Sequence, residues 1–193
     1  MKVLLAHPSV LMYSEIYLRL EPLGLERIAA AVREAGHDVR LIDLQVFSHA
    51  EFWKEVDAYQ PDAIGFGLNY LANIPEVLDL AKEAKRRISD CLVFAGGHSV
   101  SFVADEVLEH ADGAIDCIIR GEGELAATML LDAWRDGGAA LRDVPGAMTA
   151  DGPGPAPKLI DTLDNLRPAR DLLRRRRKYF IGHLDPCASI EFT

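Results

Sequence analysis

Short apolar runs alternate with amphipathic segments along most of this chain, and this alternation restricts the possible fold more than any other feature. Each run has the length of a single β-strand, and several contain β-branched residues. The runs occupy residues 2–6, 38–43, 62–68, 91–97 and 116–121. Strands that alternate with helices run parallel, because each crossover returns the chain to the same end of the sheet.

Two of the intervening segments have the apolar spacing of helices that pack on a sheet. In residues 21–36 the apolar face is formed by Leu25, Ile28, Ala29 and Val32, and Gly36 ends the pattern as a helix cap. In residues 74–88 the face is formed by Ile74, Val77, Leu78, Ala81 and Ala84. We therefore predict an α/β fold with a doubly wound, five-stranded parallel sheet. The expected topology is flavodoxin-like (Rossmann-like), with strand order 2-1-3-4-5 and helices on both faces.

Composition limits the class of protein. The chain has 193 residues, of which 49% are hydrophobic, so it can bury the core of one domain and still carry an extension. Its net charge of −9 argues against a general nucleic-acid or membrane-surface binder, since both need a basic face. No apolar run is long enough for a transmembrane segment or has the form of a signal peptide, so we expect a cytoplasmic protein.

Cysteine usage predicts neither a disulfide framework nor a zinc site. The chain has three cysteines, and none of them forms a C-x-x-C pair. Cys91 and Cys117 lie beside or within apolar runs and are expected to be buried as small hydrophobic residues. Trp53 and Trp134 have apolar neighbours at helical spacing, so we assign both to the core and not to a cofactor stack.

The sequence texture divides the chain into three parts. Residues 1–140 contain the strand and helix pattern and form the predicted domain. Residues 141–162 read as a small hairpin extension whose turn is "DGPGPAP", residues 151–157. Residues 163–193 read as a connector with no core of its own.

The connector contains five consecutive positive charges at 174–178, which we interpret as a solvated helix face. Its last residues, "ASIEFT", have a strand pattern that stops at the final residue. We therefore expect that this chain is part of a longer protein.

Function is expected in the loops that follow the strands, because a sheet of this kind binds ligands at the carboxyl ends of its strands, where the strand order reverses. The first strand is followed by "AHPSVLMYS", the third by "GFGLNYLAN", the fourth by "AGGHSVSF" and the fifth by "RGEGE". Gly96 and Gly97 allow two interpretations: a ligand lies against bare backbone, or a tight turn needs a positive φ. His98 could bind a ligand, act as an acid or base, or be an ordinary turn residue. Ser99 and Ser101 could bond a ligand, but capping of the next helix is favoured.

The carboxylates of Glu122 and Glu124 argue against a phosphate site at the start of the last helix. They could accept hydrogen bonds from amides or ribose hydroxyls, or simply form a charged helix start. P-loop, dinucleotide and hydrolase motifs are absent, and a flavin site would need a Ser/Thr-rich loop after the first strand. A receiver domain would need an aspartate at the end of the third strand, where this chain has Gly65-Phe66-Gly67. His7 follows the first strand but has no carboxylate near it in sequence.

Four stretches together resemble the N-terminal cobalamin-binding domain of cobalamin-dependent radical S-adenosylmethionine (SAM) enzymes: "PLGLERIAAAVREAGHDVRLID", "DAIGFGLNY", "VFAGGHSV" and "IIRGEGE". Within that family the sequence looks closest to the hopanoid C-3 methylase group, and cyclases that act on tetrapyrroles are near alternatives. The resemblance continues into "LDNLRPARDLL", which is similar to the link before the radical SAM barrel, and "CASIEFT", which is similar to the first barrel strand. Cys187 does not match the cysteines of the family's iron–sulfur motif.

The resemblance implies a set of cofactor-binding residues in the four loops. They are Pro8, Ser9, Gly67, Leu68, Asn69, Tyr70, Gly96, Gly97, His98, Ser99, Gly121, Glu122, Gly123 and Glu124. The D-x-H-x-x-G motif of other cobalamin domains is missing after the first strand, so we expect no histidine on cobalt. Asn69 or Tyr70 would meet the lower face of the corrin, and no residue is assigned as a metal ligand.

The resemblance further implies that the chain holds methylcobalamin, whose methyl group goes to an unactivated carbon of a lipid-like substrate. SAM and a [4Fe-4S] cluster would belong to the barrel of the full-length chain, and this part alone would perform no turnover. The alternatives are a non-catalytic cobalamin sensor or carrier domain, a tetrapyrrole cyclase and a flavodoxin-like flavin binder.

Overall fold

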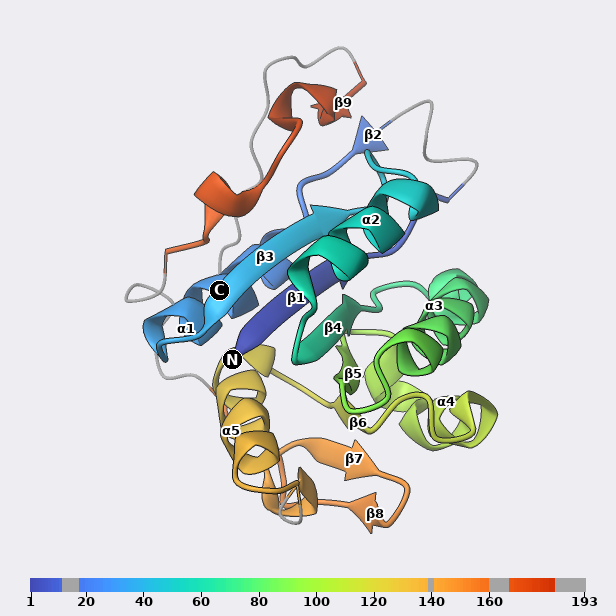
Figure 1. The fold of residues 1–193 in the computed structure, drawn as a ribbon, viewed down its shortest axis with the longest axis vertical. Coiled ribbons are helices and arrows are strands. Elements are labelled where there is room, and N and C mark those ends of the chain that lie inside the picture. The colour runs from blue at the N-terminus through green and yellow to red at the C-terminus, as the bar shows by residue number, and fades with distance from the viewer. Residues whose placement is uncertain (12–17, 139–140, 160–166, 183–193) are drawn as a thin grey trace.

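The computed structural model describes residues 1–11, 18–138, 141–159 and 167–182, which form an α/β structure around one central sheet (Figure 1). Five strands of this sheet are parallel: β1 (Lys2–His7), β3 (Asp38–Asp43), β4 (Ala63–Gly67), β5 (Leu92–Gly96) and β6 (Cys117–Ile119). They lie in the order β3-β1-β4-β5-β6. Numbered along the chain, this is the predicted order 2-1-3-4-5.

The sheet has seven strands, so the prediction of five was incomplete. β7 (Ala147–Thr149) pairs antiparallel with β6, and β8 (Gly152–Pro153) pairs antiparallel with β7. The hairpin therefore extends the main sheet, where it covers the otherwise unpaired edge of β6. Its turn lies at residues 150–151, before most of the predicted "DGPGPAP" turn. A separate two-stranded sheet joins β2 (Leu18–Arg19) to β9 (Phe180–Ile181).

Helices cover both faces of the sheet, as predicted (Figure 1). α1 (Leu23–Glu34) and α5 (Gly123–Arg135) lie on one face, and α2 (His49–Tyr59), α3 (Ile74–Arg87) and α4 (Ala104–Ala111) lie on the other. Alternate residues of β1 point to opposite cores: Leu4 packs with the α2–α3–α4 layer and Leu5 with the α1–α5 layer. Short 3₁₀ helices are η1 (Leu71–Asn73), η2 (Val100–Phe102), η3 (Leu141–Asp143), η4 (Arg170–Leu172) and η5 (Arg176–Lys178).

The predicted helix faces are largely confirmed. On α1, Leu25, Ala29 and Val32 are buried, while Ile28 is half-buried. Gly36 follows the helix with φ +87° and donates its N–H to the Arg33 carbonyl. On α3, Val77, Leu80, Ala81 and Ala84 are buried, and Ile74 and Leu78 pack against the same core. The sequence pattern did not predict that Glu26 and Arg27 of α1 are buried as well.

The assignments of cysteine and tryptophan are also confirmed within the described residues. Cys91 and Cys117 are free and fully buried, and burial raises the pKa of each thiol to about 12. Trp53 and Trp134 pack against the two cores. Cys187 and the strand pattern after it lie outside the described residues.

The charged run at 174–178 is exposed, as predicted, and Arg176–Lys178 form η5, but two of its arginines also hold the segment 167–182 against the domain. Arg174 pairs with Glu55 of α2 at 3.1 Å, and Arg175 pairs with Glu51. Both guanidinium groups lie over the ring of Phe47. Three apolar side chains of the same segment enter the α1–α5 core: Ala169, Leu173 and Tyr179.

Among the described residues, none of the helices has the length and apolar character needed to cross a membrane.

Candidate functional site

A cavity of about 570 Å³ opens at the carboxyl ends of β1, β4 and β5, on the face covered by α1 and α5. Its position beside β1 and β4 is where the strand order of the sheet reverses. The apolar part of its wall is formed by Leu5, Leu25, Ile28, Phe66, Phe94 and Ile119. Polar side chains also line it: His7, Arg27, Asn69, His98, Ser101, Glu122 and Glu124. An apolar cavity with a few polar groups is the usual form of a small-molecule site, and its size falls within the common range of roughly 300–1,000 Å³.

The cavity brings together nine of the residues that the sequence resemblance singled out. They are Gly67, Asn69, Gly96, Gly97, His98, Gly121, Glu122, Gly123 and Glu124. Five others do not line it: Pro8, Ser9, Leu68, Tyr70 and Ser99. Leu68 is buried in the opposite core, and Tyr70 is 54% exposed outside the cavity.

Bare backbone forms one side of the cavity, because Gly67 and Gly96 are direct partners in the β4–β5 register. At Gly67 a Cβ atom would touch Leu25 and His7 only at ordinary distances of 3.7 and 3.9 Å. At Gly24, on the first turn of α1, no atom lies within 4 Å of the Cβ position. A Cβ atom would therefore fit at Gly67 in ordinary contact, and at Gly24 it would meet open space.

Gly97 has a different reason to be glycine. Its φ is +134°, and a Cβ atom would lie 2.6 Å from the Leu68 carbonyl oxygen and 2.8 Å from Asn69 Oδ1. The tight-turn interpretation therefore explains Gly97, since protein atoms and not a ligand occupy the space beside it. The same contact brings the loops after β4 and β5 together, where the Leu68 N–H donates to the Gly96 carbonyl at 2.6 Å.

The two serines of this region bond to backbone and do not cap the next helix, so the favoured capping role was wrong. Ser99 Oγ donates to the Asn69 carbonyl at 2.6 Å, and Ser101 Oγ donates to the Gly97 carbonyl at 2.8 Å. α4 begins only at Ala104 and has no side-chain cap. Because η2 intervenes, both serines lie too far from the start of α4. Ser99 joins the loops after β4 and β5, and Ser101 bonds within the loop after β5.

A buried ion pair that the sequence analysis missed lies in the cavity wall. Arg27 Nε is 3.0 Å from Glu124 Oε1, and the two side chains are 6% and 14% exposed. The pair fastens the first turn of α5 to α1, so Glu124 already has a partner within the protein. An arginine beside the apolar stripe of the first helix was the available signal, but its partner lies almost a hundred residues away along the chain and was not evident.

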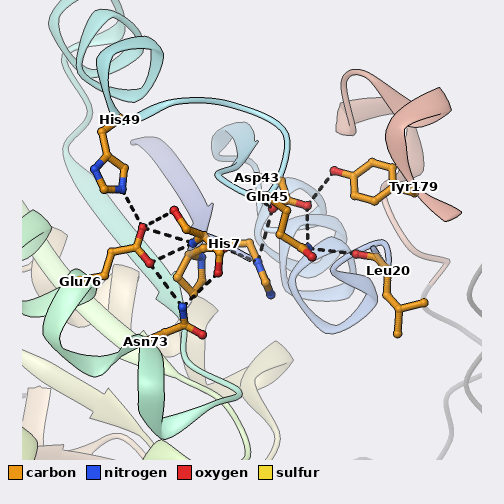
Figure 2. Close-up of polar contacts among 10 residues, drawn as sticks. His7, Leu20, Asp43, Gln45, His49, Asn73, Glu76 and Tyr179 are labelled. Carbon is orange, nitrogen blue, oxygen red and sulfur yellow. Dashed lines mark hydrogen bonds and ion pairs between the residues drawn. The ribbon is translucent and has the colours of Figure 1, made fainter. Parts of the chain in front are cut away.

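His7 also has a partner that sequence distance conceals. His7 and Asp43 face each other in the β1–β3 register, with His7 Nδ1 3.4 Å from Asp43 Oδ1 (Figure 2). Both residues are buried, and His7 lines the cavity. A carboxylate therefore stands beside this histidine, although none is near it in sequence.

Glu76 of α3 holds the loop that follows β1 (Figure 2). Its carboxylate accepts hydrogen bonds from the Ser9 N–H, Ser9 Oγ and Asn73 Nδ2, and His49 Nε2 lies 2.6 Å from Oε1. Burial opposes ionisation, but the bonds from Ser9 and His49 together lower the pKa of Glu76. Ser9 therefore faces Glu76 and fixes the loop backbone.

Exposed apolar side chains stand on the loops and elements at the carboxyl edge of the sheet, where the cavity opens. They are Tyr70, Leu71, Phe102, Leu125 and Leu159, and Phe102 is 77% exposed. Phe102 and Leu159 also line the cavity, and His98 meets the Phe102 ring edge to face at 5.4 Å between centroids. Apolar residues gathered in this way mark a surface for a ligand or another domain.

The chain is similar to known proteins along most of its length. The family model described as "B12 binding domain" matches residues 10–131. The chain is 57% identical over 193 residues to hopanoid C-3 methylase of Methylococcus capsulatus, covering all of this chain and 37% of that protein. It is 29% identical over 175 residues to the anaerobic magnesium-protoporphyrin IX monomethyl ester cyclase of Synechocystis, covering 85% of this chain and 34% of the cyclase.

One solved structure has the same fold over most of the chain. The cobalamin-dependent SAM radical enzyme OxsB, with aqua-cobalamin and SAM bound, superposes with a TM-score of 0.73. The match has 21% sequence identity and covers 89% of this chain and 24% of that one. This chain thus spans well under half the length of these relatives. Because the family model matches residues 10–131, more than half of the chain, the chain belongs to the B12-binding domain family.

Proposed function

We propose that this chain holds cobalamin as the N-terminal part of a cobalamin-dependent radical SAM methyltransferase. The observation that carries the proposal is the cavity at the sheet's switch point, which opens beneath exposed apolar side chains. When bound, methylcobalamin supplies a methyl group for transfer to an unactivated carbon of a lipid-like substrate. The protein's residues bind and orient the cofactor.

The residues present suit two different parts of the cofactor. A whole cobalamin is too large for the cavity, but its nucleotide tail is flat and aromatic at the end and suits the apolar wall of Leu25, Phe94 and Ile119. The bare backbone at Gly67 gives the tail room to pass. The corrin would then rest on the exposed apolar edge, with Asn69 of the cavity wall beneath it.

Identity favours the methylase over the cyclase, since the chain is 57% identical to the former and 29% identical to the latter. In the full-length cytoplasmic enzyme, residues 1–140 would be the cobalamin domain and 141–162 its extension. Residues 163–193 would connect it to a radical SAM barrel of the same chain that holds SAM and a [4Fe-4S] cluster. The methyl acceptor would be chosen mainly by that barrel.

Reconstitution with hydroxocobalamin tests the proposal. After desalting, the protein should retain cobalamin and show its visible absorbance. Gly67→Val should reduce retention, because the added methyl groups enter the cavity from a position with room for Cβ. Ala58→Val, on an exposed position of α2, is the matched control and should bind as the wild type does. A wild-type protein that leaves all its cobalamin on the desalting column would contradict the proposal.

A further inference from the structure

Three buried side chains connect the segment 167–182 to the wall of the cavity (Figure 2). Tyr179, Asp43 and His7 are 3%, 1% and 9% exposed. The Tyr179 hydroxyl donates to Asp43 Oδ2 at 2.7 Å, and Asp43 Oδ1 lies 3.4 Å from His7 Nδ1. Tyr179, which lies 136 positions after Asp43 in the chain, therefore contacts the same carboxylate that faces His7 in the cavity wall.

The neighbours of His7 determine which ring nitrogen carries the proton. Nδ1 lies 2.9 Å from the Pro8 carbonyl oxygen, in addition to its contact with Asp43. Both neighbours only accept hydrogen bonds, so a neutral His7 carries its proton on Nδ1 and keeps a lone pair on Nε2. Nε2 has no hydrogen-bond partner in the part of the chain that the structure describes. The ring edge that contains Cδ2 lies beside Gly67, in the cavity wall.

The Asp43 carboxylate is held in one orientation by three donated hydrogen bonds. The Gln45 N–H donates to Oδ1 at 2.9 Å, while Gln45 Nε2 and the Tyr179 hydroxyl both donate to Oδ2. Gln45 Nε2 also donates to the Leu20 carbonyl at 3.0 Å. Burial and the Asp43 charge raise the pKa of Tyr179, so its hydroxyl remains a donor throughout the physiological pH range.

We propose that Tyr179 and Asp43 are positioning residues that hold His7 with the Nε2 lone pair directed at the ligand in the cavity. Nε2 would accept a hydrogen bond from an amide N–H of cobalamin, whose corrin carries several amide side chains. This last step rests on the proposed function, whereas the orientation of His7 does not. Because Tyr179 comes from the segment 167–182, the binding site is complete only when that segment is docked.

The orientation can be tested in the ligand-free protein by NMR of ¹⁵N-labelled imidazole. The wild type should show His7 as the Nδ1–H tautomer. Tyr179→Phe removes one of the two donors at Asp43 Oδ2, so the Asp43 carboxylate should reorient and the ring nitrogen shifts of His7 should move away from their wild-type values. Tyr59→Phe is the matched control, because it deletes another buried hydroxyl that donates to the Asp38 carbonyl at 2.8 Å, at the opposite end of the sheet. It should leave His7 unchanged.

Cobalamin affinity gives a second readout. Tyr179→Phe should weaken binding roughly two- to tenfold, the range for loss of one buried hydrogen bond, and Tyr59→Phe should not. In a His7→Ala background, Tyr179→Phe should have no further effect if it acts through His7.

The outcomes separate the two proposals. If Tyr179→Phe leaves the His7 nitrogen shifts at their wild-type values, or if Tyr59→Phe moves them as far, the positioning role is wrong. If Tyr179→Phe weakens binding equally with and without His7, the connection through His7 is wrong. A wild type that shows the Nδ1–H tautomer but binds no cobalamin would refute the proposed function and leave the positioning of His7 intact.

Discussion

Replacing Gly97 by alanine should separate the structural role of this glycine from that of its neighbour Gly96. At Gly97, φ is +134° and the new Cβ would lie 2.6 Å from the Leu68 carbonyl oxygen and 2.8 Å from Asn69 Oδ1. The Asn69 side chain could rotate away, but the Leu68 carbonyl belongs to the backbone, so the loop after β4 must move. At Gly96, φ is ordinary and the nearest atom, the Ile119 carbonyl oxygen, is 3.3 Å from the Cβ position.

The expected cost of Gly97→Ala follows from two effects. An L-residue in such a backbone conformation costs of order 1–3 kcal/mol, and overpacking costs typically about 1–3 kcal/mol. Together they predict a loss of roughly 2–6 kcal/mol in the free energy of unfolding, a large share of the usual total of about 5–15 kcal/mol. Gly96→Ala should cost less than about 1 kcal/mol, because only a small adjustment of Ile119 is needed.

Urea unfolding, followed by far-ultraviolet circular dichroism, measures the difference. Gly97→Ala should lower the midpoint clearly, and Gly96→Ala should lie near the wild type. Because displacement of Leu68 also moves Asn69 in the cavity wall, Gly97→Ala should bind cobalamin more weakly even at temperatures where it is fully folded. Equal stability of the two alanine variants would refute the close approach of the β4 and β5 loops.

Three further predictions concern groups around the site. Burial, and next the charge of Glu21, raise the pKa of Glu26 to about 7, so its contribution to stability is fully present below pH 4.5 and is lost as the pH rises through 7. Glu26→Gln should remove this pH dependence of the free energy of unfolding, which is worth up to roughly 3 kcal/mol between pH 4.5 and 8. If the variant keeps the wild-type pH profile of unfolding, the pKa of Glu26 is not raised by burial. Glu76→Gln should speed amide hydrogen exchange at Ser9, because a charge-assisted bond worth about 1.5–3 kcal/mol is weakened; wild-type exchange would contradict the role of Glu76. Arg175→Ala should expose Tyr179 and Phe180 to chymotrypsin, since Arg175 bonds the Val46 carbonyl and Glu51; unchanged cleavage would mean that other contacts hold the segment.

The sequence pattern predicted the parallel sheet well because each strand is buried on both faces and each crossover is local. The hairpin itself was predicted, but its pairing with β6 was not, because an open sheet edge selects this partner and local sequence patterns do not reveal it. The exposure of 174–178 was predicted, but its ion pairs with Glu51 and Glu55 were not, since these two residues lie more than a hundred positions earlier in the chain.

The site was predicted in outline because the carboxyl ends of parallel strands meet at one edge. Side chains of an extended chain alternate between the two faces of the sheet, so successive residues after β4 point to different places. Gly67 and Asn69 face the cavity, whereas Leu68 between them enters the opposite core. The side-chain pairs Arg27–Glu124 and His7–Asp43 in the cavity wall were not predicted, because each joins distant parts of the sequence. Such pairs become visible only when strand register and helix packing are known.

Comparing cobalamin with cobinamide tests the central claim most directly, since cobinamide has the same corrin but lacks the nucleotide tail. If the tail occupies the cavity beneath Gly67, this protein should bind hydroxocobalamin much more tightly than aquacobinamide in titrations followed by visible absorbance, and Gly67→Val should remove most of the difference. Equal affinity for the two corrinoids would show that the cavity does not receive the tail.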